Sequence, residues 1–367
     1  MTWLVAILGL GLLMIVHEAG HFFAARSFGL RVLKFSIGFG PTFFKVEPDE
    51  GHYWLNTVGG RIKIKLWKHD PEKHGPTVFQ VAMIPFLAYV QIDGMNPFEE
   101  IDPDDKGSYA NASLLARVTT IVAGPLANYV SASVFFFITA YFAGLPTGPD
   151  ERFISPMPDR PAIAAGFQEG DEVVAVNGTR VHTWTEMSKA ISSANDEIPI
   201  VVRRGEQELT LRVKPQLSED GRPIIGVKPM VRKADFGAAA KHAVVHPTEW
   251  VRQQLSSIRD LFTASEEVRL GGPVAMAETM HQAAKRGWGD FVNLLGVLST
   301  ILAVFNLFPV PALDGGRLLF LGYEATTRKR ANPTVEMQIH AFGFVVLLGL
   351  MIYVTLANDF NLGGGSK

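Results

Sequence analysis

Four long apolar blocks alternate with polar segments along the chain of 367 residues. The first block would extend about 35 Å as an α-helix, enough to cross a hydrocarbon core of about 30 Å. The other blocks are of similar length, so the pattern predicts four transmembrane helices. Because this number is even, both termini are expected on one side of the membrane. The blocks cover residues 3–25, 118–144, 291–310 and 339–357.

The polar segment after the first block contains a strand pattern. Apolar residues alternate with basic ones over 61–66, which is the period-two signature of a strand with one apolar face. Residues 53–66 read as a hairpin around Gly59–Gly60, and a second strand-like run covers 86–95. We expect a small sheet, either in the cytoplasm or entering the membrane beside the first span.

The longest polar segment, between the second and third blocks, predicts a compact domain. Residues 161–181 read as a short helix, a Gly-Asp turn and a strand, and a helix over 184–193 precedes strands over 198–205 and 207–215. Residues 237–270 are helical in pattern, with apolar residues at helical spacing. This helix either lies on the membrane surface or packs on the domain before it.

Basic residues indicate how the spans are oriented. Positively charged loops stay in the cytoplasm, and the basic residues gather after the first span, before the second, and between the third and fourth. Both termini and residues 145–290 are therefore expected outside, although Lys285 and Arg286 oppose this orientation. The supporting residues are Arg26, Arg31, Lys34, Arg117, Arg317, Arg328, Lys329 and Arg330.

Composition excludes several classes of function. The net charge of −2 and the lack of a basic face argue against nucleic-acid binding. The chain has no cysteine, which excludes disulfides, thiolate zinc sites and cysteine nucleophiles. The first block lacks the basic start and cleavage site of a signal peptide, so a retained span is expected. The end of the chain, GGGSK, reads as an expression remnant.

The first span contains charged and metal-binding side chains, which are costly to place in the hydrocarbon core of a membrane. In HEAGH, His17 and His21 are four residues apart, so a helix places both imidazoles on one face where they can hold one zinc ion. Glu18 stands beside them as general base for a water molecule. Burying three polar side chains in a span costs several kcal/mol unless they are paired or bind a metal. A zinc site is therefore favoured over the alternative that these three residues are only polar positions on a helix surface.

A third metal ligand is expected from the end of the third block. Asp314 follows a run in which Asn306, Pro309 and Pro311 break the helix. Its depth in the membrane matches that of His17 and His21, and catalytic zinc takes three protein ligands with one open position. The alternative is an Asx-turn made by Asp314 with Gly315.

At these motifs the chain resembles the site-2 proteases, which are zinc intramembrane proteases, in the bacterial branch that includes the regulator of sigma-E protease. The similarity rests on HEAGH (17–21), AGPLAN (123–128), GGPVAMA (271–277) and NLFPVPALDGGRLLFL (306–321). The polar domain resembles a PDZ domain through AAGFQEGDEVVAVNG. There is room for one such domain, whereas well-known relatives carry two, and IPFLAYV departs from the Gly-Gly that relatives often have before the tyrosine.

The resemblance implies an endopeptidase that uses one Zn²⁺ ion to cut single-span membrane proteins, such as an anti-sigma factor or remnant signal peptides. An unwound substrate would add as a strand to the edge at 60–66 or 86–93. The PDZ domain would act outside, as a size filter or as a binder of peptide carboxylates. Two roles remain for Asn128: it lines the cavity, or it packs between helices. The substrate-binding candidates are Gly60, Tyr89, Asn128, Asn306, Pro309 and Pro311.

The expected fold is a polytopic α-helical protein of the bacterial inner membrane, with four transmembrane helices, a membrane-associated β-sheet in the first cytoplasmic loop, and an extracytoplasmic α+β PDZ domain. The active site is expected towards the cytoplasmic side. The boundaries are spans at 1–26, 112–144, 288–316 and 335–358, the sheet loop at 27–111, the PDZ domain at 145–232, amphipathic helices at 233–287, a loop at 317–334, and a tail at 359–367.

Two other classes of function remain as rivals. A non-catalytic zinc-containing scaffold acting through its PDZ domain would not need Glu18, and a structural zinc site would prefer four protein ligands. A metal transporter would need ionisable residues along several spans, and the second and fourth blocks have almost none.

Overall fold

The computed structural model describes residues 2–49, 51–64, 75–96, 102–146, 152–194, 196–218, 221–262 and 272–359. Three features named above lie outside these ranges: the end of the strand pattern beyond residue 64, Gly271 of the GGPVAMA motif, and the tail beyond residue 359. The chain divides into two compact units, which are described separately. The first comprises Met1–Phe137 with His242–Lys367, and the second Ile138–Lys241.

Four helices are long and apolar enough to cross a membrane, which confirms the prediction of four long apolar helices. They are α1 (Thr2–Ser27), α3 (Leu114–Ile138), α8 (Trp288–Leu307) and α10 (Pro333–Val354). The last begins before the predicted residue 339. Pro333 suits a first helical turn, and the Asn332 side chain accepts a hydrogen bond from the Thr334 N–H at 2.9 Å.

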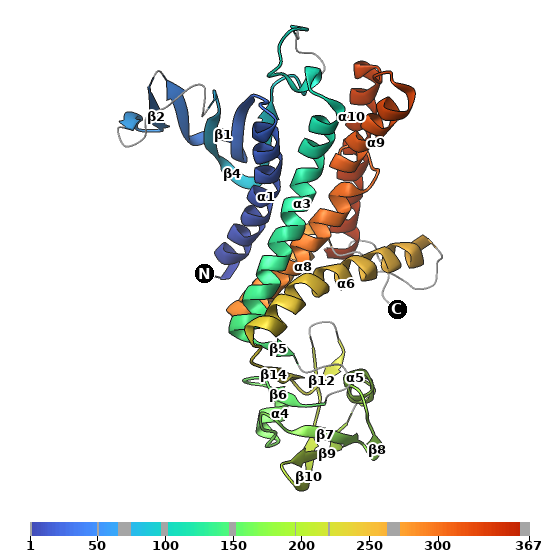
Figure 1. The fold of residues 1–367 in the computed structure, drawn as a ribbon. Coiled ribbons are helices and arrows are strands. Elements are labelled where there is room, and N and C mark those ends of the chain that lie inside the picture. Colours follow the sequence, from blue (N-terminus) through green and yellow to red (C-terminus); the bar gives the residue numbers. More distant parts are fainter. Residues whose placement is uncertain are drawn as a thin grey trace. The chain divides into compact units, whose positions relative to one another are not determined.

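Small residues let the spans approach closely (Figure 1). A Cβ atom added at Gly20 of α1 would lie 2.7 Å from the carbonyl carbon of Ala123 in α3. Helix α7 (Pro273–Arg286) packs against α1, where Met280 is fully buried with Leu13. Because lipid supplies no hydrophobic drive between helices, such close packing is what holds the bundle together.

The third span ends earlier than predicted, and a further helix follows it. Helix α8 ends at Leu307, and α9 (Asp314–Thr327) occupies most of the segment predicted as a loop at 317–334. A Cβ added at Gly315 or Gly316 would lie 2.5 Å from Leu307 C or Val310 O. These two glycines therefore allow α9 to fold back tightly onto the end of α8.

The first loop forms a four-stranded sheet of order β3-β2-β1-β4, which confirms the predicted sheet. The predicted hairpin corresponds to β2 and β3, with Gly60 at φ 142°. Strand β1, which the sequence pattern did not predict, joins this hairpin to β4. The strands are β1 (Val32–Asp49), β2 (His52–Thr57), β3 (Gly60–Ile64) and β4 (Val78–Ile92).

The end of β4 forms one outer edge of this sheet. Ser36 of β1 pairs with both Gln80 and Tyr89, so the start of β1 lies between the two ends of β4. Within the described chain, no further strand pairs with residues 88–92. Strand β4 also packs against α1 (Figure 1). An open row of backbone groups therefore lies beside the first span.

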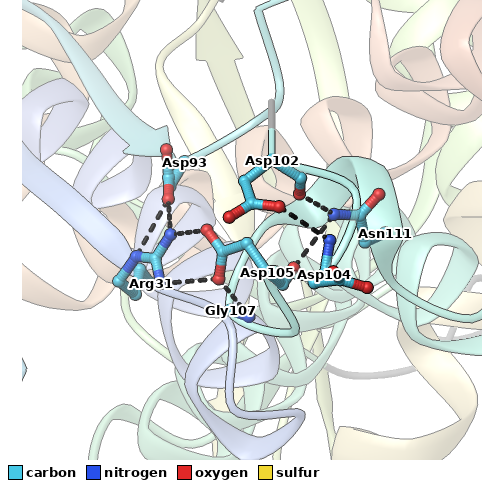
Figure 2. Close-up of polar contacts among 7 residues, drawn as sticks. All are labelled: Arg31, Asp93, Asp102, Asp104, Asp105, Gly107 and Asn111. Carbon is cyan, nitrogen blue, oxygen red and sulfur yellow. Dashed lines mark hydrogen bonds and ion pairs between the residues drawn. The ribbon is translucent and has the colours of Figure 1, made fainter. Parts of the chain in front are cut away.

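A charged clamp ties the start of β1 and the end of β4, which pair with each other, to the segment before α3 (Figure 2). Arg31 precedes β1, Asp93 follows β4, and the Arg31 guanidinium bridges Asp93 and Asp105, with Nη1 2.8 Å from Asp105 Oδ1. The Arg31 N–H also donates to Gly107 O at 2.9 Å. The Asp105 pKa is lowered chiefly by the Arg31 hydrogen bond.

The second unit has the predicted helix and strands around one core. Its four-stranded sheet has the order β10-β9-β7-β8, and Val173, Met187 and Ile200 are buried against one another. The elements are β5 (Leu145–Pro146), β6 (Ile154–Pro156), α4 (Pro161–Ala164), β7 (Glu172–Val176), β8 (Thr179–Arg180), α5 (Trp184–Ser192), β9 (Ile198–Arg204), β10 (Gln207–Val213), β11 (Gln216–Leu217), β12 (Pro223–Ile224), β13 (Val227–Pro229) and β14 (Val231–Arg232). The amphipathic helix follows as α6 (Phe236–Phe262).

Candidate metal centre

Helix α1 aims two buried imidazoles at one point. His17 and His21 lie one turn apart and are each 7% exposed. Their Nε2 atoms are 3.2 Å apart, and the rings meet edge to face. Two nitrogen lone pairs that converge in this way repel each other unless a cation or a proton lies between them. The pair is therefore arranged to share a positive partner.

Asp314 completes a triangle of donor atoms. Its Oδ2 lies 3.2 Å from His17 Nε2 and 3.3 Å from His21 Nε2. A tetrahedron of Zn–N and Zn–O bonds of about 2.0–2.1 Å has edges of about 3.3 Å, so the triangle fits one face of it. Asp314 Oδ2 is buried with no hydrogen-bond partner in the described chain. These three residues could hold a metal ion.

A strained turn delivers Asp314 to this point. Ala312 has a left-handed φ of 74°, unusual for a residue with a side chain, and its N–H donates to His340 Nδ1 of α10 at 2.9 Å. A Cβ added at Gly343 of α10 would lie 2.9 Å from the Pro311 carbonyl carbon. Helix α10 therefore holds the turn before Asp314 in place.

Partners behind the imidazoles set their orientation. His21 Nδ1–H donates to the Thr120 carbonyl at 2.8 Å, which leaves Nε2 with its lone pair. His17 Nδ1 lies 3.2 Å from the side-chain nitrogen of Asn128, whose Oδ1 has no partner among the described atoms. A half-turn of this amide lets Oδ1 accept the His17 Nδ1–H, so His17 Nε2 can also bind a metal.

A polar network holds Asn128 between two spans. Asn128 is fully buried. The hydroxyls of Ser131 in α3 and Ser299 in α8 each lie 2.9 Å from the Asn128 carbonyl and 2.7 Å from each other, so one can donate to the carbonyl while the other donates to its neighbouring hydroxyl. Hydrogen bonds between spans are stabilising in lipid, where water offers no alternative partner. Asn128 thus orients the His17 ring, and it also lines the cavity.

Glu18 stands between the imidazoles and the sheet. Its carboxylate accepts a backbone hydrogen bond from Val90, in the open edge of β4. Glu18, His17, His21 and Asp314 line one cavity of about 390 Å³. A carboxylate beside a metal site and a strand edge can take a proton from water next to a peptide held on that edge.

The predicted substrate residues separate into two groups. Tyr89, Asn128 and Asn306 line the same cavity as Glu18. Pro309 and Pro311 instead line an apolar groove of about 500 Å³ between the turn, α9 and α10. Gly60 starts β3, at the edge of the sheet opposite residues 88–92. The structure therefore brings three of the six candidates to the cavity.

Sequence reasoning missed two functional candidates. Thr120 acts through its backbone carbonyl, which no residue pattern reveals. Arg317 lines the cavity one helical turn after Asp314, and this spacing was a usable signal.

A second, larger cavity of about 650 Å³ adjoins the first, and Met95 and Arg317 line both. In its wall Arg117, 6% exposed, donates to Glu324 Oε2 at 2.9 Å. This hydrogen bond lowers the Glu324 pKa. Burial raises the pKa of Tyr109, which lines the same cavity, to about 12, so its hydroxyl stays protonated at neutral pH. The second cavity is therefore polar and charged.

Comparison with known proteins covers almost the whole chain. The model of Peptidase family M50 matches residues 5–350. The zinc metalloprotease RasP of Geobacillus kaustophilus is 30% identical over 400 residues, covering 94% of each chain. A candidate zinc metalloprotease of Clostridium perfringens is 29% identical over 355 residues, covering 96% of each. Among solved structures, the PDZ domain of an SdrC-like protein from Listeria monocytogenes matches 23% of this chain and 90% of its own, with 23% identity and a TM-score of 0.20.

Proposed function

The chain belongs to peptidase family M50, and from this premise we propose that it is a zinc-dependent intramembrane endopeptidase. It hydrolyses a peptide bond within or near the transmembrane segment of single-span membrane proteins. The observation that carries the proposal is the triangle of donor atoms beside Glu18, in a cavity lined by apolar spans.

His17, His21 and Asp314 hold the Zn²⁺ ion. Their donor atoms lie 3.2–3.3 Å apart, and the Nδ1 partners of both imidazoles leave the Nε2 atoms available. When bound, the ion supplies Lewis acidity to the attacking water and the scissile carbonyl. Three protein ligands leave one position open, which a catalytic site needs and a structural site does not.

Glu18 moves the proton. It accepts a proton from the attacking water and donates it to the leaving amide nitrogen, so that the peptide bond breaks into a carboxylate and an amine. The backbone hydrogen bond from Val90 keeps the carboxylate beside the edge of β4. Proton transfer and substrate position are therefore controlled at the same place.

The edge at residues 88–92 binds the unwound substrate. A transmembrane helix shields its own peptide bonds, and a backbone that unwinds in the membrane needs new hydrogen-bond partners. Strand addition provides them, and Tyr89, Val90 and Ile92 of this edge line the cavity whereas Gly60 does not. Tyr89 and Asn306 contact the substrate, and Asn128 orients His17. Pro309 and Pro311 shape the turn that carries Asp314.

The protein lies in a bacterial inner membrane with the active site towards the cytoplasm. Four candidate spans and the basic loops support this orientation, with both termini and residues 145–290, including an outer unit at 145–232, outside. This outer unit is a PDZ domain that filters or binds ectodomains before cleavage. The substrates are membrane proteins already trimmed outside, such as an anti-sigma factor or remnant signal peptides, and the process is regulated intramembrane proteolysis.

A non-catalytic zinc scaffold is the alternative. It gives no reason for Glu18 to face the cavity beside an open strand edge, and the described residues contain no fourth protein ligand for the triangle. The catalytic function accounts for both features.

The test is cleavage of a panel of single-span substrates by purified protein in nanodiscs. Glu18→Gln should abolish cleavage and keep stoichiometric zinc, because it removes the base and leaves the three ligands. Asp314→Asn should lower the zinc content. Glu249→Gln, an exposed carboxylate in α6, is the matched control. Cleavage by Glu18→Gln at the wild-type rate would refute the assignment of the base, and unchanged zinc in Asp314→Asn would remove this ligand.

A further inference from the structure

Arg317 is a cation at the boundary between the catalytic cavity and the larger polar cavity. It lines both, and it lies three residues after Asp314 on α9, on the same face of the helix. Apart from the two histidines of the metal triangle, it is the one basic side chain among the described residues that line the catalytic cavity. The other charged groups there, Glu18 and Asp314, are acidic.

Arg317 differs from the neighbouring arginines because no carboxylate contacts it directly within the described chain; Glu336 attracts its charge only through space. Arg117 is hydrogen-bonded to Glu324, and Arg330 lies 3.5 Å from the same carboxylate. Glu336 lines the polar cavity together with Arg317, but no ion pair joins them, and Arg317 forms no hydrogen bond within the described part of the chain. A half-buried guanidinium without a direct partner is suited to bind an anion from outside the chain.

The proposed reaction makes such an anion in this cavity. Hydrolysis adds water across the peptide bond, so the fragment on the carbonyl side ends in a new carboxylate and the other fragment in an amine. The Zn²⁺ ion would compensate the charge of Asp314, so the new carboxylate is repelled chiefly by the carboxylate of Glu18, and a nearby cation offsets this repulsion. Arg317 is the described residue of the cavity wall that can do so with a planar pair of donors.

We propose that Arg317 binds the newly formed carboxylate of the cleaved substrate and directs that fragment from the catalytic cavity towards the polar cavity. The inference rests on the proposed function. The ligand class is a peptide with a free C-terminal carboxylate, and a peptide amide of the same sequence lacks the recognised charge. Arg317 is a product-binding residue, distinct from the metal ligands and from Glu18.

The test compares two peptides that match the carbonyl-side fragment of a cleaved model substrate, one a free acid and one an amide. Binding is measured on full-length Glu18→Gln protein in nanodiscs, with zinc bound and again after chelation. With Arg317 intact, the acid should bind about 10-fold to 100-fold more tightly than the amide. Adding Arg317→Gln should remove most of this preference under both conditions, and Arg317→Lys should keep part of it.

Arg330→Gln is the matched control, because it removes the same charge from the polar cavity without touching the catalytic one. It should keep the full preference for the acid. An equal preference with and without Arg317, at unchanged zinc content, would overturn the inference. Substrate cleavage by the otherwise wild-type protein tests the proposed function separately, so protein that cleaves but shows no Arg317-dependent preference refutes this inference alone.

Discussion

Replacing Gly124 by alanine should disable the metal centre through a single added methyl group. The new Cβ would lie 2.5 Å from Cε1 and 2.9 Å from Cδ2 of the His21 ring, and closer still to Nε2, whereas ordinary contact begins at 3.4 Å. The ring would have to move by about 1 Å, which is half the length of a Zn–N bond of about 2.0–2.1 Å. The hydrogen bond from His21 Nδ1 to the Thr120 carbonyl opposes this movement.

The assay measures zinc per protein molecule and the cleavage rate of a single-span substrate in nanodiscs. Gly124→Ala should lose most of its zinc at low free-metal concentration. With zinc restored in excess, cleavage should still fall about 100-fold, because a displacement of about 1 Å in a reacting group has this effect.

Gly11→Ala in α1 is the matched control. Nothing lies within 4 Å of its added Cβ, so zinc content and rate should stay at the wild-type values. Folding of Gly124→Ala is checked by its melting temperature in the presence of excess zinc. A folded Gly124→Ala protein whose zinc affinity and cleavage rate both stay within a factor of two of wild type would show that α3 does not pack closely against His21.

Three further predictions concern groups away from the reacting atoms. Asn128→Ala should weaken zinc binding about 10-fold to 100-fold in a competition titration, because His17 loses the partner that orients it. Arg31→Gln should speed hydrogen exchange at residues 88–92 about fivefold, because the clamp holds the end of β4 through Asp93 and local opening becomes easier without it; unchanged exchange would contradict it. Burial would raise the Asp171 pKa, but the hydrogen bonds from Arg204 and Gln168 outweigh it and lower this pKa. Asp171 therefore stabilises its unit above the unfolded pKa near 4, and the contribution is lost as pH falls through the folded value. The protection factors for hydrogen exchange in β7, corrected for the intrinsic rate at each pH, should fall in acid, and this pH dependence should be lost in Asp171→Asn.

The parts of this protein that sequence predicts well are those encoded by local spacing. The spans follow from uninterrupted apolar blocks, and the four-residue spacing of His17 and His21 fixes a shared helix face. The hairpin of β2 and β3 follows from its alternation and its glycine turn. Each of these patterns needs only neighbours along the chain.

The parts that sequence did not predict depend on contacts between distant segments. Strand β1 has no clear alternation, and its position between the two ends of β4 depends on residues more distant in the chain. Helix α9 follows two prolines and has two glycines in its first turn, a run typical of a loop, and it folds because those glycines fit against the end of α8 and the turn after it. Sequence alone left two candidate sheet edges for substrate binding, because the choice between them depends on the packing of β4 against α1.

The donor triangle joins residues that lie far apart in the chain. His17 and His21 are made first, and Asp314 emerges from the ribosome only after the third span and the outer unit. A chain still being synthesised therefore carries an incomplete triangle, and so does any product truncated before residue 314. The proposed peptidase therefore stays inert until its chain has been synthesised through Asp314.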